Sequence, residues 1–240
     1  MELIKKSGVP IAAPSANKFG HVSPTKPQHV LKDFEHNDVL IIDGGPCSFG
    51  IESTVLKIVH EKSKQYLLLI LRKGGVSQES LQKTISEPTI FKDLILRVES
   101  KAHVPRPSHN EPESTAPQEA PGMLLKHYSP HVDTYIVDDA RLSPVPLAQC
   151  GLIDFGKRHS AHKEEMKWYK DLSEKGDIKE AICNIYEFLR QAEVQEEVKA
   201  ILLVNMKAED VMDKIQLHKE HLEALYDRMY RSAAGKIIDK

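Results

Sequence analysis

Several short polar segments of this sequence gather residue types that bind small ligands. The first, IAAPSANKFGHVSPT at residues 11–25, has little steric bulk and contains Ser15, Asn17 and Ser23. Small side chains let backbone N–H groups approach a ligand, and hydroxyls and an amide can hydrogen-bond phosphate or ribose oxygens. An ordinary turn followed by a capped helix accounts for the same composition, so this segment alone does not define a site.

Two later segments have a similar character. Residues 43–55, DGGPCSFGIESTV, place a glycine pair after a strand and end on Ser53 and Thr54, which suits either a ligand loop or a long hairpin connection. Cys47 is expected to be a small buried residue rather than a nucleophile, because no partner base can be assigned to it. In LRKGG, Arg72 follows an apolar strand. Its side chain could bind a phosphate or a carboxylate there, or could simply be solvated.

A proline-rich stretch divides the chain. Residues 101–131 carry many prolines and few bulky apolar side chains, so most of the stretch is expected to be a linker. Its end differs, because apolar residues return there together with Lys126, His127 and Tyr128. We therefore expect the end of the linker to pack on another part of the molecule.

The elements on the two sides of this linker differ in pattern. Before it we expect short elements separated by turns: strands at 38–43, 53–59 and 65–75, a helix at 23–34 with Ser23 as N-cap and Pro24 at its first position, and a helix at 76–85 capped by Ser77. After it we expect strands to alternate with helices: strands at 133–138, 150–156 and 200–206, and helices at 177–192 and 221–236. This alternation predicts a small parallel α/β domain.

Composition indicates a cytoplasmic protein with no membrane segment. The formal net charge is −2, so no global basic field favours nucleic acid or an acidic membrane surface. No apolar run approaches the ~20 residues that cross a bilayer, and the first residues lack the apolar core of a signal peptide. Three widely separated cysteines suit reduced thiols. His159 and His162 are expected at the surface, and no spacing predicts a metal site.

Taken together, four motifs resemble those of a known family in order and approximate spacing. VPIAAPSANKFGHVSPT, IIDGGPCSFGIESTV, LRKGGVS and PGMLLKHYSPH resemble segments of threonylcarbamoyl-AMP synthases with a YrdC-like catalytic domain, and the ending EALYDRMYRSAAGKII resembles their C-terminal helix. The resemblance implies an α/β fold in three parts. These are the C-terminal half of a YrdC-like twisted-sheet catalytic domain at 1–100, a linker with a pocket-covering segment at 101–132, and a small Rossmann-like parallel domain at 133–240.

The resemblance also implies an activity. Such nucleotidyltransferases make threonylcarbamoyl-AMP and pyrophosphate from L-threonine, bicarbonate and ATP with Mg²⁺, and the product feeds the tRNA machinery that forms threonylcarbamoyladenosine at position 37. No side chain is assignable as a general acid or base, because the chemistry relies on positioning and charge neutralisation. The implied contacts are Ser15, Asn17, Ser23, Arg72, His127 and Tyr128 to ATP, Ala13, Ser53 and Thr54 to threonine, and Lys126 in a lid.

The sequence departs from the family pattern in one respect. It lacks the family's PTET-Y-G start, its Lys-x-Arg segment and its PGP-T motif. Arg72, Lys73 and Lys126 alone are too few to compensate the four negative charges of ATP. We therefore expect the chain to be a fragment that is inactive alone. Two alternatives remain: a module that holds nucleotide or double-stranded RNA without turnover, which the net charge disfavours, or a protein-docking fragment of the tRNA-modification pathway.

Overall fold

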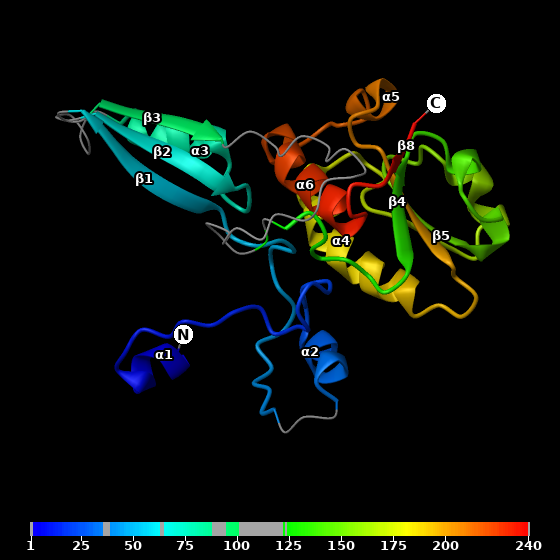
Figure 1. The fold of residues 1–240 in the computed structure, drawn as a ribbon, viewed down its shortest axis with the longest axis horizontal. Coiled ribbons are helices and arrows are strands. Elements are labelled where there is room, and N and C mark those ends of the chain that lie inside the picture. Colours follow the sequence, from blue (N-terminus) through cyan, green and yellow to red (C-terminus); the bar gives the residue numbers. More distant parts are fainter. Residues whose placement is uncertain are drawn as a thin grey trace.

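The protein contains two separate β-sheets, joined by helices and loops (Figure 1). The computed structural model describes residues 2–35, 39–62, 65–87, 95–100, 122 and 124–239. The proline-rich part of the predicted linker, residues 101–121, therefore lies outside the described residues. Among the described helices, none combines the length and the apolar character needed to cross a bilayer.

The larger sheet is parallel throughout and follows the linker. Its strand order is β6-β5-β7-β4-β8, and each neighbouring pair is parallel. Its strands are β4 (Asp133–Val137), β5 (Cys150–Asp154), β6 (Trp168–Asp171), β7 (Ala200–Val204) and β8 (Ile237–Ile238). β5 and β7 are buried along their whole length, as expected for the apolar central strands of a parallel sheet. The predicted α/β fold with a parallel sheet is confirmed.

Two long helices cover one face of this sheet. They are α4 (Ile178–Glu193) and α6 (Leu222–Ser232), and the predicted helices at 177–192 and 221–236 are thereby confirmed. Asp177 caps α4 by accepting a hydrogen bond from the backbone N–H of Lys179 at 2.8 Å. The buried stripe of α4 includes Ile182, Ile185 and Leu189, which pack in the same cluster as alternate strand residues.

The opposite face of the larger sheet has a lighter cover. Val145 and Leu147 pack there, from a connection that contains only the 3₁₀ turns η1 (Ala140–Leu142) and η2 (Leu147–Gln149). The other short elements of this part lie in its loops. They are η3 (Ser160–Glu165), α5 (Glu209–Met212) and η4 (Lys219–His221).

The smaller sheet precedes the linker and has the order β1-β2-β3. Its strands are β1 (Val55–Lys62), β2 (Gln65–Arg72) and β3 (Ile95–Ser100). β1 pairs antiparallel with β2, whereas β2 pairs parallel with β3. Helix α3 (Gln78–Ile85) lies beside β3, and the hydroxyl of Ser77 caps it as predicted, accepting from the N–H of Ser80 at 3.1 Å.

Three expectations for the first fifty residues are wrong. The predicted helix at 23–34 is shorter: α2 spans Pro27–Asp33, with Lys26 rather than Ser23 as N-cap, because the second proline rather than Pro24 takes the first turn. Residues 39–43 of the predicted strand form no strand, and Leu40 is 91% exposed because no described strand pairs with it. Cys47 is exposed rather than buried.

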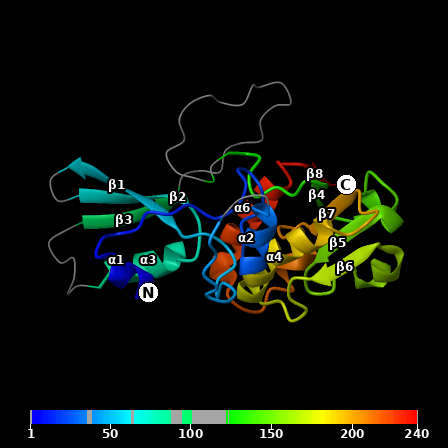
Figure 2. The same cartoon turned by 90° about the horizontal axis from the view of Figure 1, so that it is seen from below.

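Helix α2 is held against α4 by buried charge pairs (Figure 2). The Arg190 guanidinium binds the Asp33 carboxylate through two hydrogen bonds, of 3.0 and 2.7 Å, and each side chain is 5% exposed. Glu187 accepts from Lys26 at 2.5 Å and lies 3.1 Å from the His29 ring. Charged side chains therefore attach α2 to α4, while the apolar Val22 just before α2 packs in the same core cluster as α4.

The Arg190–Asp33 pair gives a stability prediction. We expect Arg190→Ala to lower the free energy of unfolding by about 3–5 kcal/mol, because the Asp33 charge would stay buried without its partner. Urea unfolding followed by circular dichroism measures this change. Arg97→Ala is the matched control, because Arg97 and its partner Glu99 are both about half exposed, and an exposed pair contributes at most ~1 kcal/mol. Equal stability of the two variants would contradict the prediction.

Candidate functional site

A cavity of about 750 Å³ lies where the opening loop, the loop before β1, the end of β2 and the end of the linker meet. Seven of the predicted site residues line it. They are Ala13, Ser15, Asn17, Ser53, Arg72, His127 and Tyr128. Segments far apart in the sequence therefore form the walls of one space.

Asn17 shapes the wall that comes from the opening loop. Its amide Nδ2 donates to the carbonyl oxygens of Lys18 at 2.9 Å and His21 at 3.1 Å, so a side chain rather than a helix cap fixes this turn. Its Oδ1 atom is buried and has no hydrogen-bond partner among the described residues. An acceptor atom is thus available in the cavity wall.

Arg72 and Ser53 form a second wall. The antiparallel pairing of β1 and β2 places Val55 opposite Arg72, which brings the end of β2 beside Ser53. Arg72 donates to the Ser53 carbonyl oxygen from Nε at 3.2 Å and from Nη2 at 3.0 Å, and Nη2 lies 3.3 Å from Ser53 Oγ. The hydroxyl and the cation therefore line the cavity as one unit.

The end of the linker closes the cavity on a third side. Ser129 N–H donates to the Gly20 carbonyl oxygen at 2.9 Å, and Arg231 of α6 donates to the Leu124 carbonyl oxygen at 2.7 Å. Tyr128 is 1% exposed and stacks on Tyr186 of α4 with ring centroids 5.5 Å apart. The segment packs on the larger domain, as its apolar residues predict.

Two more polar atoms around the cavity have no partner among the described residues. They are Nδ1 of His127 and the hydroxyl of Tyr128, and both are buried. Burial lowers the pKa of His127, and the nearby Arg231, Arg228 and Arg72 charges lower it further despite the opposing effect of Glu52. Since buried polar atoms nearly always have partners, these atoms are available to a polar group in the cavity.

Beneath the cavity, Arg228 of α6 is completely buried. It donates to Glu52 from Nε at 2.7 Å and to the Lys73 carbonyl oxygen from Nη2 at 2.8 Å, and its guanidinium lies 5.1 Å from the Tyr128 ring centroid. Glu52 also accepts hydrogen bonds from Ser23 at 2.7 Å and from Tyr186 at 3.0 Å. One carboxylate thus joins the opening loop, α4 and α6.

The other three predicted site residues do not line the cavity. Ser23 is buried and its hydroxyl bonds Glu52. Thr54 Oγ1 donates to the Val76 carbonyl oxygen at 2.6 Å and accepts from its N–H at 3.1 Å, which ties the loop before α3 in place. Lys126 is exposed. Their predicted contacts to ligands stay predictions.

Sequence reasoning did not single out Phe19, Glu52 or Arg228. Phe19 and Glu52 line the cavity, and Arg228 lies behind it. Glu52 is adjacent to the predicted Ser53, but nothing in its local spacing shows that a cation from the last helix neutralises it. Such a partner becomes visible only in the fold.

A second cavity, of about 490 Å³, lies at the carboxyl ends of β4, β5 and β7. The connections after β5 and β7 leave in opposite directions, which is the place where open parallel sheets bind ligands. The prediction that His159 lies at the surface is wrong, because the residue is 7% exposed. Its backbone N–H donates to the buried Asp154 carboxylate at 2.8 Å, which holds this loop against the end of β5. Its Nε2 atom has no partner among the described residues.

Two family models match the chain. The model described as "Threonylcarbamoyl-AMP synthase, C-terminal domain" matches residues 76–234, and the model described as "Telomere recombination" matches residues 1–74. The first match covers well over half of the chain.

Relatives and solved structures agree with these matches. A threonylcarbamoyl-AMP synthase of Bacillus subtilis is 36% identical over 130 residues, 54% of this chain and 31% of that protein. One of Pyrococcus abyssi is 35% identical over 141 residues, 59% of this chain and 35% of that protein. The crystal structure of P. abyssi Sua5 complexed with L-threonine matches with a TM-score of 0.67 at 25% identity, over 100% of this chain and 62% of that chain. The matched region is therefore well under half of these two relatives.

The buried Glu52 carboxylate predicts how stability depends on pH. Although burial raises its pKa, the Arg228 charge and the hydrogen bonds from Ser23 and Arg228 leave the pKa below its ordinary 4.5. A depressed folded-state pKa stabilises the protein above about pH 4.5, and this stability is lost as the pH falls further.

We therefore expect Glu52→Gln to be less stable than the parent protein at pH 7 and to lose less stability between about pH 5 and pH 3. Urea unfolding at a series of pH values measures both effects. Glu223→Gln is the control, since Glu223 is half exposed and 3.5 Å from Lys73. Parallel pH profiles for the parent protein and Glu52→Gln would contradict the prediction.

Proposed function

The chain belongs to the threonylcarbamoyl-AMP synthase family, and we propose that its cavity of about 750 Å³ holds L-threonine and ATP for the synthesis of threonylcarbamoyl-AMP. One observation carries this proposal: seven residues implied by the family motifs line one cavity, whose walls contain three buried polar atoms without partners among the described residues. The likeness to a structure complexed with L-threonine supports it.

The proposed chemistry needs positioning more than acid–base groups. Bicarbonate breaks down to carbon dioxide and hydroxide, the neutral threonine amine adds to the carbon dioxide to form a carbamate, and the proton that the amine loses combines with the hydroxide to give water. A carbamate oxygen then attacks the α-phosphorus of ATP, the bond to the β-phosphate bridging oxygen breaks, and pyrophosphate leaves. Ser53 and Arg72 are placed to hold polar groups of the substrates, while Asn17 offers an acceptor. The product would then serve threonylcarbamoyladenosine formation at position 37 of tRNA.

Mg²⁺ would come with the phosphates of ATP rather than with a protein site. Glu52 is the only carboxylate among the described residues of the cavity lining, and it already accepts from Ser23, Tyr186 and Arg228. Mg²⁺ is commonly held by substrate phosphates together with one or two carboxylates. These cavity residues therefore do not fit a resident ion, and no step is assigned to one.

The end of the linker would protect the reacting groups. Tyr128 and His127 lie at the cavity, and the backbone around them is tied to the opening loop and to α6. A carbamate and an adenylate both decompose in water, so a wall that limits the access of water favours product. Lys126, which is exposed on this segment, is proposed to contact the nucleotide once the cavity is occupied.

We further propose that this chain supplies only part of a complete site. Arg72 is the only lysine or arginine among the described lining residues, whereas ATP carries four negative charges that need compensation. Apolar side chains before and within the smaller sheet are also exposed to solvent. Leu40 is 91% exposed, and Ile58 in β1 is 70% exposed. Exposed apolar surface of this kind is typical of a region that other polypeptide covers.

A binding experiment tests the cavity. We expect the full chain to bind L-threonine or ATP measurably by isothermal titration calorimetry, and Arg72→Ala to remove most of this binding, because charge-assisted hydrogen bonds are roughly twice as strong as neutral ones. Arg97→Ala, which removes an exposed arginine of β3 that lines neither cavity, should bind like the parent protein. With ATP, L-threonine, bicarbonate and Mg²⁺, we expect no pyrophosphate release. Turnover would overturn the partial-site proposal, and an absence of binding would overturn the assignment of the cavity.

The two neighbouring hydroxyls should behave differently. Ser53→Ala removes a hydroxyl at the cavity, and we expect about fivefold weaker threonine binding, which corresponds to ~1 kcal/mol, with little change in stability. Thr54→Val removes two hydrogen bonds to Val76, and we expect the free energy of unfolding to fall by about 1–3 kcal/mol while threonine binding stays. Calorimetry and urea unfolding of both variants measure this. The reverse pattern would place the threonine site next to Thr54.

A further inference from the structure

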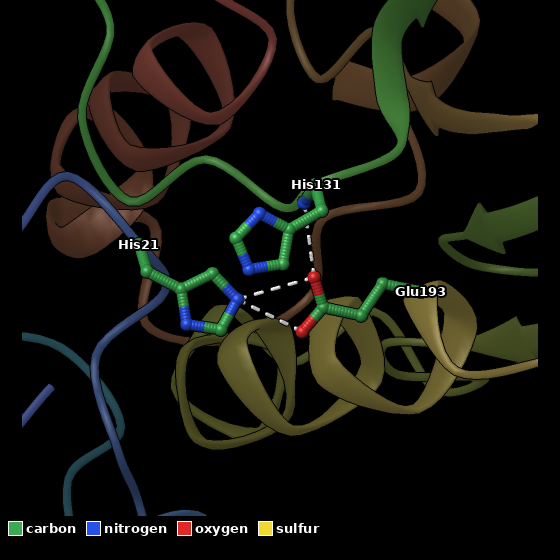
Figure 3. A group of neighbouring side chains, drawn as sticks. All are labelled: His21, His131 and Glu193. Atoms are coloured by element: carbon green, nitrogen blue, oxygen red, sulfur yellow. Dashed lines mark hydrogen bonds and ion pairs between the residues drawn. The ribbon is translucent and has the colours of Figure 1, made fainter. Parts of the chain in front are cut away.

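Two histidines and a glutamate from three different segments meet outside the cavity (Figure 3). They are His21 of the opening loop, His131 at the end of the linker and Glu193, the last residue of α4. One potential ligand atom from each lies within 4.8 Å of the other two. Nothing in the local sequence spacing brings them together, because tertiary structure alone forms the group.

Existing contacts already hold the group together. His21 Nε2 lies 2.9 and 3.1 Å from the two carboxylate oxygens of Glu193, and the His131 backbone N–H donates to Glu193 Oε2 at 3.0 Å. The two imidazole rings stack, with centroids 4.6 Å apart and planes 13° apart. In Figure 3 both rings lie beside the carboxylate. The orientation of His21 and Glu193 is thus set before any ligand binds.

The surroundings of His21 also resemble those of a metal ligand. Its second ring nitrogen, Nδ1, faces the Asp33 carboxylate at 3.6 Å, and Arg190 in turn holds Asp33 through two hydrogen bonds. A carboxylate behind a histidine orients the ring and raises its basicity in many metal sites. Nδ1 has no hydrogen-bond partner among the described residues, so a small shift of the ring would complete this contact.

The donor set selects the class of ion. Two imidazoles and one carboxylate suit Zn²⁺ and similar divalent transition metals, whereas Mg²⁺ and Ca²⁺ prefer oxygen ligands alone. Tetrahedral ligands of zinc lie about 3.4 Å apart, which the His21–Glu193 pair nearly meets. His131 is exposed, so its ring can turn toward the other two and a water can take the fourth position.

We propose that His21, His131 and Glu193 form a binding site for a divalent transition-metal ion of the Zn²⁺ class. The ion joins two walls of the cavity to α4. Gly20, which precedes His21, lines one wall, and Tyr128, three residues before His131, lines the other. Because a metal ion binds imidazole and carboxylate ligands in their deprotonated forms, its binding competes with protons and weakens at low pH. This inference does not depend on the substrate that the cavity holds.

The test uses the full chain after treatment with a chelator. We expect calorimetry to show one Zn²⁺ bound per chain, and Co²⁺ in its place to give the visible absorption of a four-coordinate site. His131→Ala leaves the backbone N–H bond to Glu193 intact. Losing a residue that only supports a metal ligand lowers metal affinity by ~10- to 100-fold. Because His131 would be a ligand itself, we expect its loss to lower zinc affinity by at least that much. His162→Ala is the matched control. His162 also pairs with a glutamate, Glu165, at 2.8 Å, but no third ligand joins this pair among the described residues.

A second pair of variants tests direct coordination. In His131→Cys a thiolate would bind the ion, so the Co²⁺ complex should gain a thiolate-to-cobalt charge-transfer band that the parent protein lacks and that His162→Cys does not show. Glu193→Gln keeps the shape of the side chain and an acceptor for the His131 backbone N–H but should also bind zinc more weakly. If the parent protein binds Zn²⁺ no more tightly than His131→Ala, the group is only a hydrogen-bonded contact between the linker and α4, and the proposal is wrong.

Discussion

The buried guanidinium of Arg228 is the interaction on which the junction of the two halves depends. Arg228 lies on α6, beside the larger sheet. Its guanidinium donates hydrogen bonds to Glu52, before β1, and to the Lys73 carbonyl oxygen, after β2. It also lies over the Tyr128 ring. A completely buried cation without these partners would cost several kcal/mol. The segment before β1, the segment after β2 and the end of the linker therefore all contact the Arg228 guanidinium.

The same network carries the candidate site. Glu52 faces the cavity and accepts from Ser23 and Tyr186 as well as from Arg228, so the cavity rests on α4 and α6 rather than on loops alone. The Asp33–Arg190 pair repeats this principle one helix away, where α2 meets α4. Polar loops without regular structure can keep a defined shape because buried ion pairs fix their ends.

Much of the larger domain could be predicted from sequence, and the reasons are physical. Uninterrupted apolar runs such as 200–204 have one stable location, the middle of a parallel sheet, and Asp177 before an apolar stripe marks a helix start. Residues 38–43 show the same apolar pattern but form no strand in their described part, because a strand needs a neighbour that the pattern does not reveal. Residues of the four polar segments line one cavity, which no single segment predicts, since each alone also fits a turn.

What could not be predicted has one cause: partners far apart in the sequence. His21 and Glu193 are separated by 172 positions, and Glu52 and Arg228 by 176. The polar atoms without partners among the described residues follow a different logic, because Asn17 Oδ1, His127 Nδ1 and the Tyr128 hydroxyl are all buried around one cavity. Leaving such atoms unbonded costs about 1–3 kcal/mol each. Under the proposed function, a ligand that forms hydrogen bonds with these three atoms would recover this cost.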